Sequence, residues 1–251
     1  MIFVLGLAGL LIAYNALLNA LSLQERRLYL PVNLAGAAVL VLIGRARGLS
    51  WEALGLGAGG IGLGLALGGV IAVLIAGGLA MAWAVPGLHG LLHDRRMAQV
   101  DARELAYRAL LRIPLGTALA EEVAFRGVLF GVWAAHQPEA TALAGSSLAF
   151  GLWHIVPTLT LLRVNRIGRT TEHRVVGVAI GVAATTLAGA GLGYLRILTG
   201  GIVGPVVVHA SVNSLGAVAA FIVQTRERLS SRHPRGPRGA TPGRRRGRPT
   251  R

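Results

Sequence analysis

Seven long apolar runs constrain this chain more than any other feature of its sequence. An apolar run of about 18 or more residues predicts a membrane-spanning helix, because about 20 residues at 1.5 Å each cross the hydrocarbon core. The composition agrees, with 53% hydrophobic and only 14% charged residues. We therefore expect an all-α, polytopic transmembrane helix bundle with about seven spans (six to eight). The runs are residues 1–23, 28–43, 58–85, 113–135, 140–162, 175–198 and 201–223.

Arginine placement orients these spans. All 25 basic residues are arginine, and we attribute the absence of lysine to a GC-rich bacterial genome. If the C-terminus is cytoplasmic, the inward segments 24–27, 86–112, 163–174 and 224–251 hold 2, 5, 4 and 10 arginines, or 21 in all. The outward segments hold only Arg45, Arg47 and Arg196. This positive-inside bias predicts an integral cell-membrane protein with its N-terminus outside and its C-terminus cytoplasmic.

Two segments outside the spans, a loop and the C-terminal tail, are rich in charged residues. The loop 86–112 has apolar residues at helical spacing, which indicates an interfacial helix on the cytoplasmic face. The tail 224–251 is rich in Arg, Pro and Gly, and we expect it to be disordered and to lie near anionic head groups. Since no aromatic residues alternate with its charges, no nucleic-acid partner is expected.

The stretch LAEEVAFRGVLFG, residues 119–131, places three charges inside the fourth run. Each ionisable residue at the centre of a span costs about 2.5–3.5 kcal/mol, so these side chains must face protein or a water-filled cavity. Glu122 and Arg126 are spaced i, i+4 and can pair. Glu121 lies about 100° round the helix. It can point into the bundle without a cationic partner, which makes it a candidate general base.

Polar residues of two other spans fall at a similar depth. His154 follows Phe150 by four residues in the fifth run, and His209 and Asn213 share a face of the seventh. Glu121 and His154 each lie about 12 Å from the cytoplasmic end of their spans, and Asn213 and His209 about 15–21 Å. Each residue alone could be a packing polar, as we expect for Tyr14, Asn15 and Asn19. The agreement in depth predicts one joint site.

The residue types narrow the chemistry. An aspartyl intramembrane protease needs two Asp within spans, but Asp94 and Asp101 lie in one loop. The stretch AGSSLAF is not the Gly-x-Ser-Gly of a rhomboid-like enzyme, and His-Glu-x-x-His is absent. Without cysteine, thiolate catalysis and cysteine-ligated zinc are excluded. A glutamate, two histidines and an asparagine remain.

Three motifs then resemble a known family. EEVAFR fits EExxxR, FGLWH fits FxxxH and HASVN fits HxxxN, in that order and on separate spans, and LSWEALGLG resembles a segment common before the core. Over residues 113–223 the chain is similar to the CPBP family of intramembrane endopeptidases, the CAAX proteases and bacteriocin-processing enzymes, also called Abi. The resemblance implies four parts: N-terminal helices over 1–85, the loop 86–112, a catalytic transmembrane core over 113–223 and the tail 224–251.

The resemblance also implies a role for each motif residue. Glu121 and His154 would activate the attacking water, and His209 and Asn213 would polarise the scissile carbonyl and stabilise the oxyanion. Glu122 and Arg126 would be a supporting pair, with Phe150 alongside. The metal question stays open, because Glu121, His154 and His209 could hold Zn²⁺, whereas asparagine is a poor zinc ligand and a good oxyanion donor.

Other functions stay open as well. The first expectation is an endopeptidase acting on a peptide or a membrane protein, and prenylated CAAX substrates are not expected in a GC-rich bacterium. The second is a non-proteolytic membrane scaffold or a bacteriocin-immunity-like protein of the same fold. The third is a proton-coupled transporter, which the common depth of the polar groups and the lack of an internal repeat argue against.

Overall fold

The computed structural model describes residues 2–21, 27–168 and 170–232, and all its regular structure within them is helical. Residues 233–251 of the expected tail lie outside the described residues. The first half of the chain contains α1 (Ile2–Ala20), α2 (Tyr29–Ala46), η2 (Ala58–Gly60), α3 (Ile61–Ala84), η3 (Pro86–Leu92), η4 (Arg95–Met97), α4 (Ala102–Tyr107) and η5 (Arg108–Leu119). The second half contains α5 (Ala120–Glu122), η6 (Val123–Leu129), α6 (Phe130–Ala134), α7 (Glu139–Trp153), α8 (Ile155–Val164), α9 (Thr171–Thr199) and α10 (Val203–Arg232).

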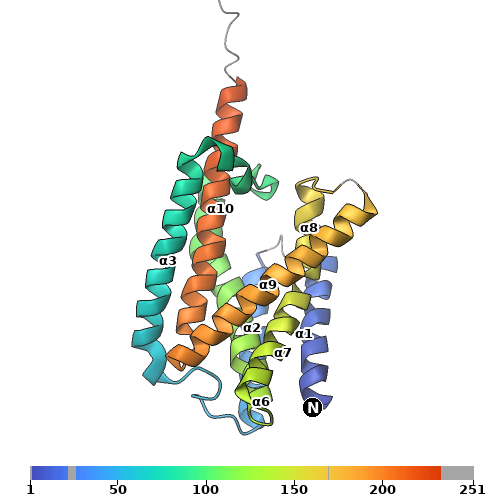
Figure 1. Ribbon diagram of the computed structural model, residues 1–251, viewed down its shortest axis with the longest axis vertical. Helices are drawn as coiled ribbons and strands as arrows, with labels where there is room; N and C mark the ends of the chain where they lie inside the picture. Colours follow the sequence, from blue (N-terminus) through green and yellow to red (C-terminus); the bar gives the residue numbers. More distant parts are fainter. Residues whose placement is uncertain (1, 22–26, 169, 233–251) are drawn as a thin grey trace, which may run out of the picture.

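Six helical segments of the described chain are long and apolar enough to cross a membrane. They correspond to six of the seven expected spans, and the polytopic helical bundle is confirmed. Their outer faces are apolar, as lipid-facing surfaces are, and Leu187 on α9 is 73% exposed. In Figure 1 the N-terminus and the far end of α10 lie at opposite ends of the bundle. The six segments are Ile2–Ala20, Tyr29–Ala46, Ala58–Ala84, Glu139–Val164, Thr171–Thr199 and Val203–Leu229.

The seventh expected span, 113–135, lies within a continuous helical run from 102 to 134 and is the central helix of the bundle. Its three ionisable residues lower its apolar character, which is why it is not among the six. It is also the most enclosed, since residues 122–132 are all buried. The hydrophobic core forms around it, with Phe125, Val128 and Leu129 fully buried. Protein rather than lipid therefore surrounds the motif helix.

Local signals explain where α9 begins and ends. The Thr170 side chain accepts a hydrogen bond from the His173 backbone N–H at the N-terminus of the helix. At the other end Gly200 has φ of 70°, a left-handed conformation that glycine adopts without steric cost. The short turn that follows brings α10 back along the bundle, so that α9 crosses it diagonally (Figure 1).

Close backbone contact joins α10 to α3, which run side by side in Figure 1. A Cβ placed on Gly68 would lie 3.0 Å from the carbonyl oxygen of Gly204, so neither helix has room for a side chain there. Small residues of this kind allow membrane helices to approach closely. The packing fixes the position of α10, the helix that carries the HxxxN motif.

The last helix is longer than the sequence predicted. We expected the disordered tail to begin at residue 224, but α10 continues to Arg232. Side chains beyond Val223 have partners on the neighbouring segment: Gln224 Nε2 lies 2.8 Å from His93 Nε2, and Arg226 covers the Trp83 ring at 4.3 Å. These contacts offset the polar composition that made this stretch read as a tail.

Candidate active site

The two motif glutamates lie where the central helix changes its winding. Glu121 and Glu122 form most of the short α5, which lies between two π-helical segments, η5 and η6. Pro114 within η5 has no backbone N–H to donate. π-helical turns are rare and occur frequently at functional sites. The winding sets the directions in which the two adjacent carboxylates leave the helix.

Glu122 is fully buried and binds two partners through one oxygen. Arg126 Nη1 donates to Glu122 Oε1 at 3.0 Å, so the expected i, i+4 pair is present. His209 Nδ1 donates to the same oxygen at 2.8 Å, which the sequence did not predict. This bond fixes the imidazole ring, with Nδ1 toward Glu122 and Nε2 available on its other side.

Arg126 has contacts on three sides. Its Nη2 donates to the carbonyl oxygen of Gly189 at 3.0 Å, and its guanidinium lies 4.0 Å from the Phe150 ring centroid. A Cβ on Gly189 would lie 3.2 Å from both Arg126 and Phe150, so the absence of a side chain leaves room for the guanidinium. Arg196 supports the same residue by donating to its backbone carbonyl at 2.7 Å. Nothing in the residues around Gly189 indicated this contact.

Glu121 is in a different environment from its neighbour. Its side chain is 11% exposed, whereas that of Glu122 is 0% exposed. Glu121 Oε2 lies 3.8 Å from His209 Nε2, too far for a hydrogen bond, and is buried without a partner among the described residues. This oxygen therefore faces the second nitrogen of an imidazole whose first nitrogen Glu122 already holds.

His154 occupies the break between α7 and α8. Its Nδ1 lies 2.8 Å from the carbonyl oxygen of Phe150, so Nδ1 carries the proton and Nε2 keeps its lone pair. The Phe150 ring lies between the two imidazoles, 4.5 Å from the His154 ring and 5.9 Å from the His209 ring, centroid to centroid. The FxxxH motif thus contributes an aromatic wall that the two histidines share.

Asn213 is the motif residue that the structure ties least to the others. It is partly buried, one turn after His209 on α10, and no hydrogen bond between described residues involves its side chain. Its neighbour Ser214 donates to the Ala109 carbonyl at 2.8 Å and so joins α10 to the central helix at this level. The structure brings Glu121, Glu122, Arg126, His209, Phe150 and His154 into one connected cluster.

Glutamate and histidine side chains are common zinc ligands, and the cluster contains both. A zinc site needs three or four protein ligands around one point at about 2.0–2.3 Å. Among residues 2–21, 27–168 and 170–232, no group of three or more His, Asp or Glu side chains is placed to hold an ion. Glu121, His154 and His209 as placed do not fit the zinc site suggested by their types.

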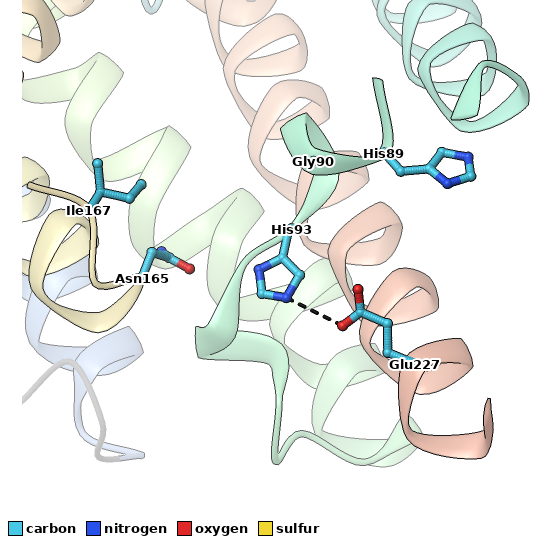
Figure 2. Close-up of a pocket in the computed structure, with 6 residues that line it drawn as sticks. All are labelled: His89, Gly90, His93, Asn165, Ile167 and Glu227. Atoms are coloured by element: carbon cyan, nitrogen blue, oxygen red, sulfur yellow. Dashed lines mark ion pairs between the residues drawn. The ribbon is translucent and has the colours of Figure 1, made fainter. Parts of the chain in front are cut away.

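A separate pocket of about 370 Å³ lies elsewhere, lined by His89, Gly90, His93, Asn165, Ile167 and Glu227. Figure 2 shows the ion pair between His93 Nε2 and Glu227 Oε2, which are 3.3 Å apart. Glu227 follows His209 by 18 residues on α10, or about 27 Å at the helical rise. The pocket is therefore distinct from the cluster around Glu121.

Comparison with known proteins bears on the motif-bearing segment. Residues 104–215 match the family model described as Type II CAAX prenyl endopeptidase Rce1-like. No curated protein and no solved structure gave a significant match. The matched segment contains all three motifs, and it supports a CAAX-type intramembrane protease at the level of the family. The resemblance indicated by the motifs is thereby confirmed at the level of the matched segment: residues 104–215 fit the Rce1-like model, which corresponds to the CAAX protease family.

Proposed function

We propose that this chain is an intramembrane endopeptidase that hydrolyses a peptide bond of a membrane-associated protein or peptide, with Glu121 as the general base. The observation that carries the proposal is the difference between the two adjacent glutamates. Glu122 Oε1 is used by both Arg126 and His209, and its side chain has no solvent-exposed surface. Each glutamate keeps one buried oxygen without a partner among the described residues, but only Glu121 is partly exposed and has neither oxygen bound to Arg126 or His209 at hydrogen-bond distance. A base must reach water and the reacting atom, and Glu121 is the carboxylate that can.

The reaction follows from the atoms that remain free. Glu121, assisted by His154, takes a proton from a water molecule as the water oxygen attacks the scissile carbonyl carbon. His209, protonated on both ring nitrogens so that Nδ1 donates to Glu122 and Nε2 to the substrate, and the Asn213 amide stabilise the negative oxygen of the tetrahedral intermediate. The C–N bond then breaks, and the proton held by Glu121 passes to the leaving amine. No step uses a metal, because the described side chains form no three-ligand group.

The supporting residues act by orientation. Glu122 holds His209 so that Nε2 is directed toward Glu121, and Arg126 balances the charge of Glu122 in an enclosed site. We further infer that the N-terminus is outside and the C-terminus is cytoplasmic, which the arginine bias favours. The basic tail would then lie near anionic head groups of the cytoplasmic leaflet.

Comparative proteomics of new N-terminal and C-terminal peptides tests the function. Cells carrying the wild type are compared with cells carrying Glu121→Gln, and with Glu172→Gln, which makes the same chemical change at an exposed position of α9. We expect product peptides in the wild type and in Glu172→Gln, and none in Glu121→Gln. Equal product from all three would refute Glu121 as the base. If wild type and Glu121→Gln both yield no product but bind a common partner, the scaffold function is favoured instead.

A further inference from the structure

A proline explains why the helix breaks at His154. In a continuous α-helix, the N–H of residue 157 would donate to the carbonyl of residue 153. Residue 157 is Pro157, which has no N–H, so the Trp153 carbonyl loses its partner. At the same point His154 adopts φ of −82° and ψ of 0°, and it separates α7 from α8. A carbonyl left without a donor inside a bundle is costly, because no bulk water can replace the lost bond.

The missing donor comes from the first helix. Asn15 of α1 donates from Nδ2 to the Trp153 carbonyl oxygen at 2.7 Å. Its side chain is well enclosed, since Asn15 is only 3% exposed. Asn19 Nδ2 donates to Asn15 Oδ1 at 3.1 Å, which orients the Asn15 amide with its nitrogen toward Trp153. The Tyr14 ring also stacks on the Trp153 ring at 6.3 Å. Two residues of one turn of α1 thus contact the break, and Asn19 in the next turn orients one of them.

The break in turn sets the direction of the His154 ring. The backbone N–H of His154 donates to Gly151, one residue short of the α-helical acceptor Phe150. The Phe150 carbonyl is therefore free to accept the bond from His154 Nδ1 at 2.8 Å. In an unbroken helix the backbone N–H of His154 would also bind that carbonyl, and the ring would have to share it. The shifted backbone bond of His154 and the bond of its ring to Phe150 therefore occur together at the break.

We propose that Asn15 is a positioning residue for His154: by binding the carbonyl that Pro157 leaves without a donor, it holds the helix break that sets the direction of the His154 ring. This inference rests on the proposed function, because it assigns Asn15 to the catalytic step through His154. Asn15 lies outside residues 104–215, the segment that the family model covers. The first helix would then help to position a catalytic side chain, in addition to packing against α7.

The principal test replaces Asn15 with leucine, which has a similar volume and no donor. We expect kcat to fall about tenfold to a hundredfold with KM unchanged, as a misplaced catalytic group predicts. The matched control is Asn33→Leu. Asn33 is a buried asparagine of α2 that donates to the Tyr29 carbonyl at 2.8 Å and accepts from the Tyr14 hydroxyl at 3.2 Å, so its replacement disturbs Tyr14 but leaves the bond to the Trp153 carbonyl in place. If Asn33→Leu loses as much kcat as Asn15→Leu at equal stability, the role of Asn15 is only structural and the proposal fails.

A double variant keeps the proposal testable if Asn15→Leu does not fold. In Asn15→Leu/Pro157→Ala, residue 157 regains an N–H that can donate to the Trp153 carbonyl. We expect thermal stability to recover while kcat stays low, because a repaired helix changes the backbone conformation of His154 that sets the direction of its ring. Recovery of both stability and kcat would overturn the proposal.

A spectroscopic readout separates this proposal from the proposed function. ¹⁵N NMR of labelled histidine side chains, assigned with His154→Ala, reports which ring nitrogen of His154 carries the proton. We expect Nδ1–H in the wild type and a mixture of tautomers in Asn15→Leu. An unchanged tautomer in the folded variant would overturn the proposal. The spectrum needs no turnover, so it remains informative even if no substrate is cleaved and the endopeptidase assignment is refuted.

Discussion

Glu122 and His209 are joined by a 2.8 Å hydrogen bond between side chains that lie 87 positions apart in the sequence. The bond links the EExxxR motif of the central helix to the HxxxN motif of α10. Because the same Glu122 oxygen also accepts from Arg126, the second glutamate of the motif is committed to holding other side chains. The first glutamate, Glu121, is not held in this way and is the residue that we propose as the base. Two adjacent and chemically identical residues therefore have separable roles.

Glutamine substitutions at these two positions should fail in different ways. We expect Glu121→Gln to lower kcat about a hundredfold or more, as loss of a general base does, with little change in thermal stability. Glu122→Gln should destabilise the protein by about 3 kcal/mol, because it leaves the buried Arg126 guanidinium without a counter-charge. Melting in detergent and turnover of an identified substrate measure the two effects. Similar losses of stability in both variants would argue against the separation of roles.

The contact between Gly189 and Arg126 should be sensitive to a single side chain. Gly189→Val places atoms against both Arg126 and Phe150, and overpacking of this kind costs about 1–3 kcal/mol. Gly191→Val is the matched control on the same helix, since nothing lies within 4 Å of a Cβ there. We expect a lower melting temperature and lower activity only for Gly189→Val. Equal effects of the two variants would mean that helix propensity, not the contact, is responsible.

The sequence predicted the bundle well because membrane crossing is a property of local composition. Apolar runs located all six candidate spans of the described chain and the central helix. The cost of intramembrane charge indicated that Glu121, Glu122 and Arg126 face inward. The partners of these residues were harder to predict, since they depend on which helices meet. Two contacts join helices that are distant in sequence. One is the bond from Glu122 to His209, and the other is the close approach of Arg126 to Gly189.

Asn15 is another residue whose partner could not be predicted from the sequence. We interpreted it as a packing polar of the first span, because nothing near it in the sequence suggested a partner. Pro157 was the available signal: a proline in a span leaves the carbonyl four residues earlier without a donor. That signal identifies the need for a donor at Trp153 but not the helix that supplies it. The extension of α10 beyond Val223 depends likewise on partners, among them His93.

The loop above the bundle should lose a stabilising contact in acid. Burial raises the pKa of Asp94, but hydrogen bonds from Arg96, the Arg96 charge and the bond from Asn165 outweigh it, so the pKa lies below its usual value. A carboxylate with a depressed pKa stabilises the fold above about pH 3.9, its ordinary value, and this contribution disappears as the pH falls through the depressed pKa. We expect Asp94→Asn to lower stability by about 1 kcal/mol at neutral pH. In strong acid the difference from the wild type should vanish, and a difference that persists there would contradict this account.

Metal content provides the last prediction. Glu121, His154 and His209 are of the right types for zinc, yet they form no three-ligand group, and Glu122 holds the Nδ1 side of His209. Recruiting zinc would require His154 and His209 to move toward one point past the Phe150 ring that lies between them. We therefore expect purified protein to contain substoichiometric zinc by elemental analysis and to keep its activity after dialysis against a chelator. Stoichiometric zinc that is lost with activity on dialysis, restored by zinc and absent from His154→Ala would show instead that the three side chains close around an ion, and that Glu121 acts as a ligand and not as the base.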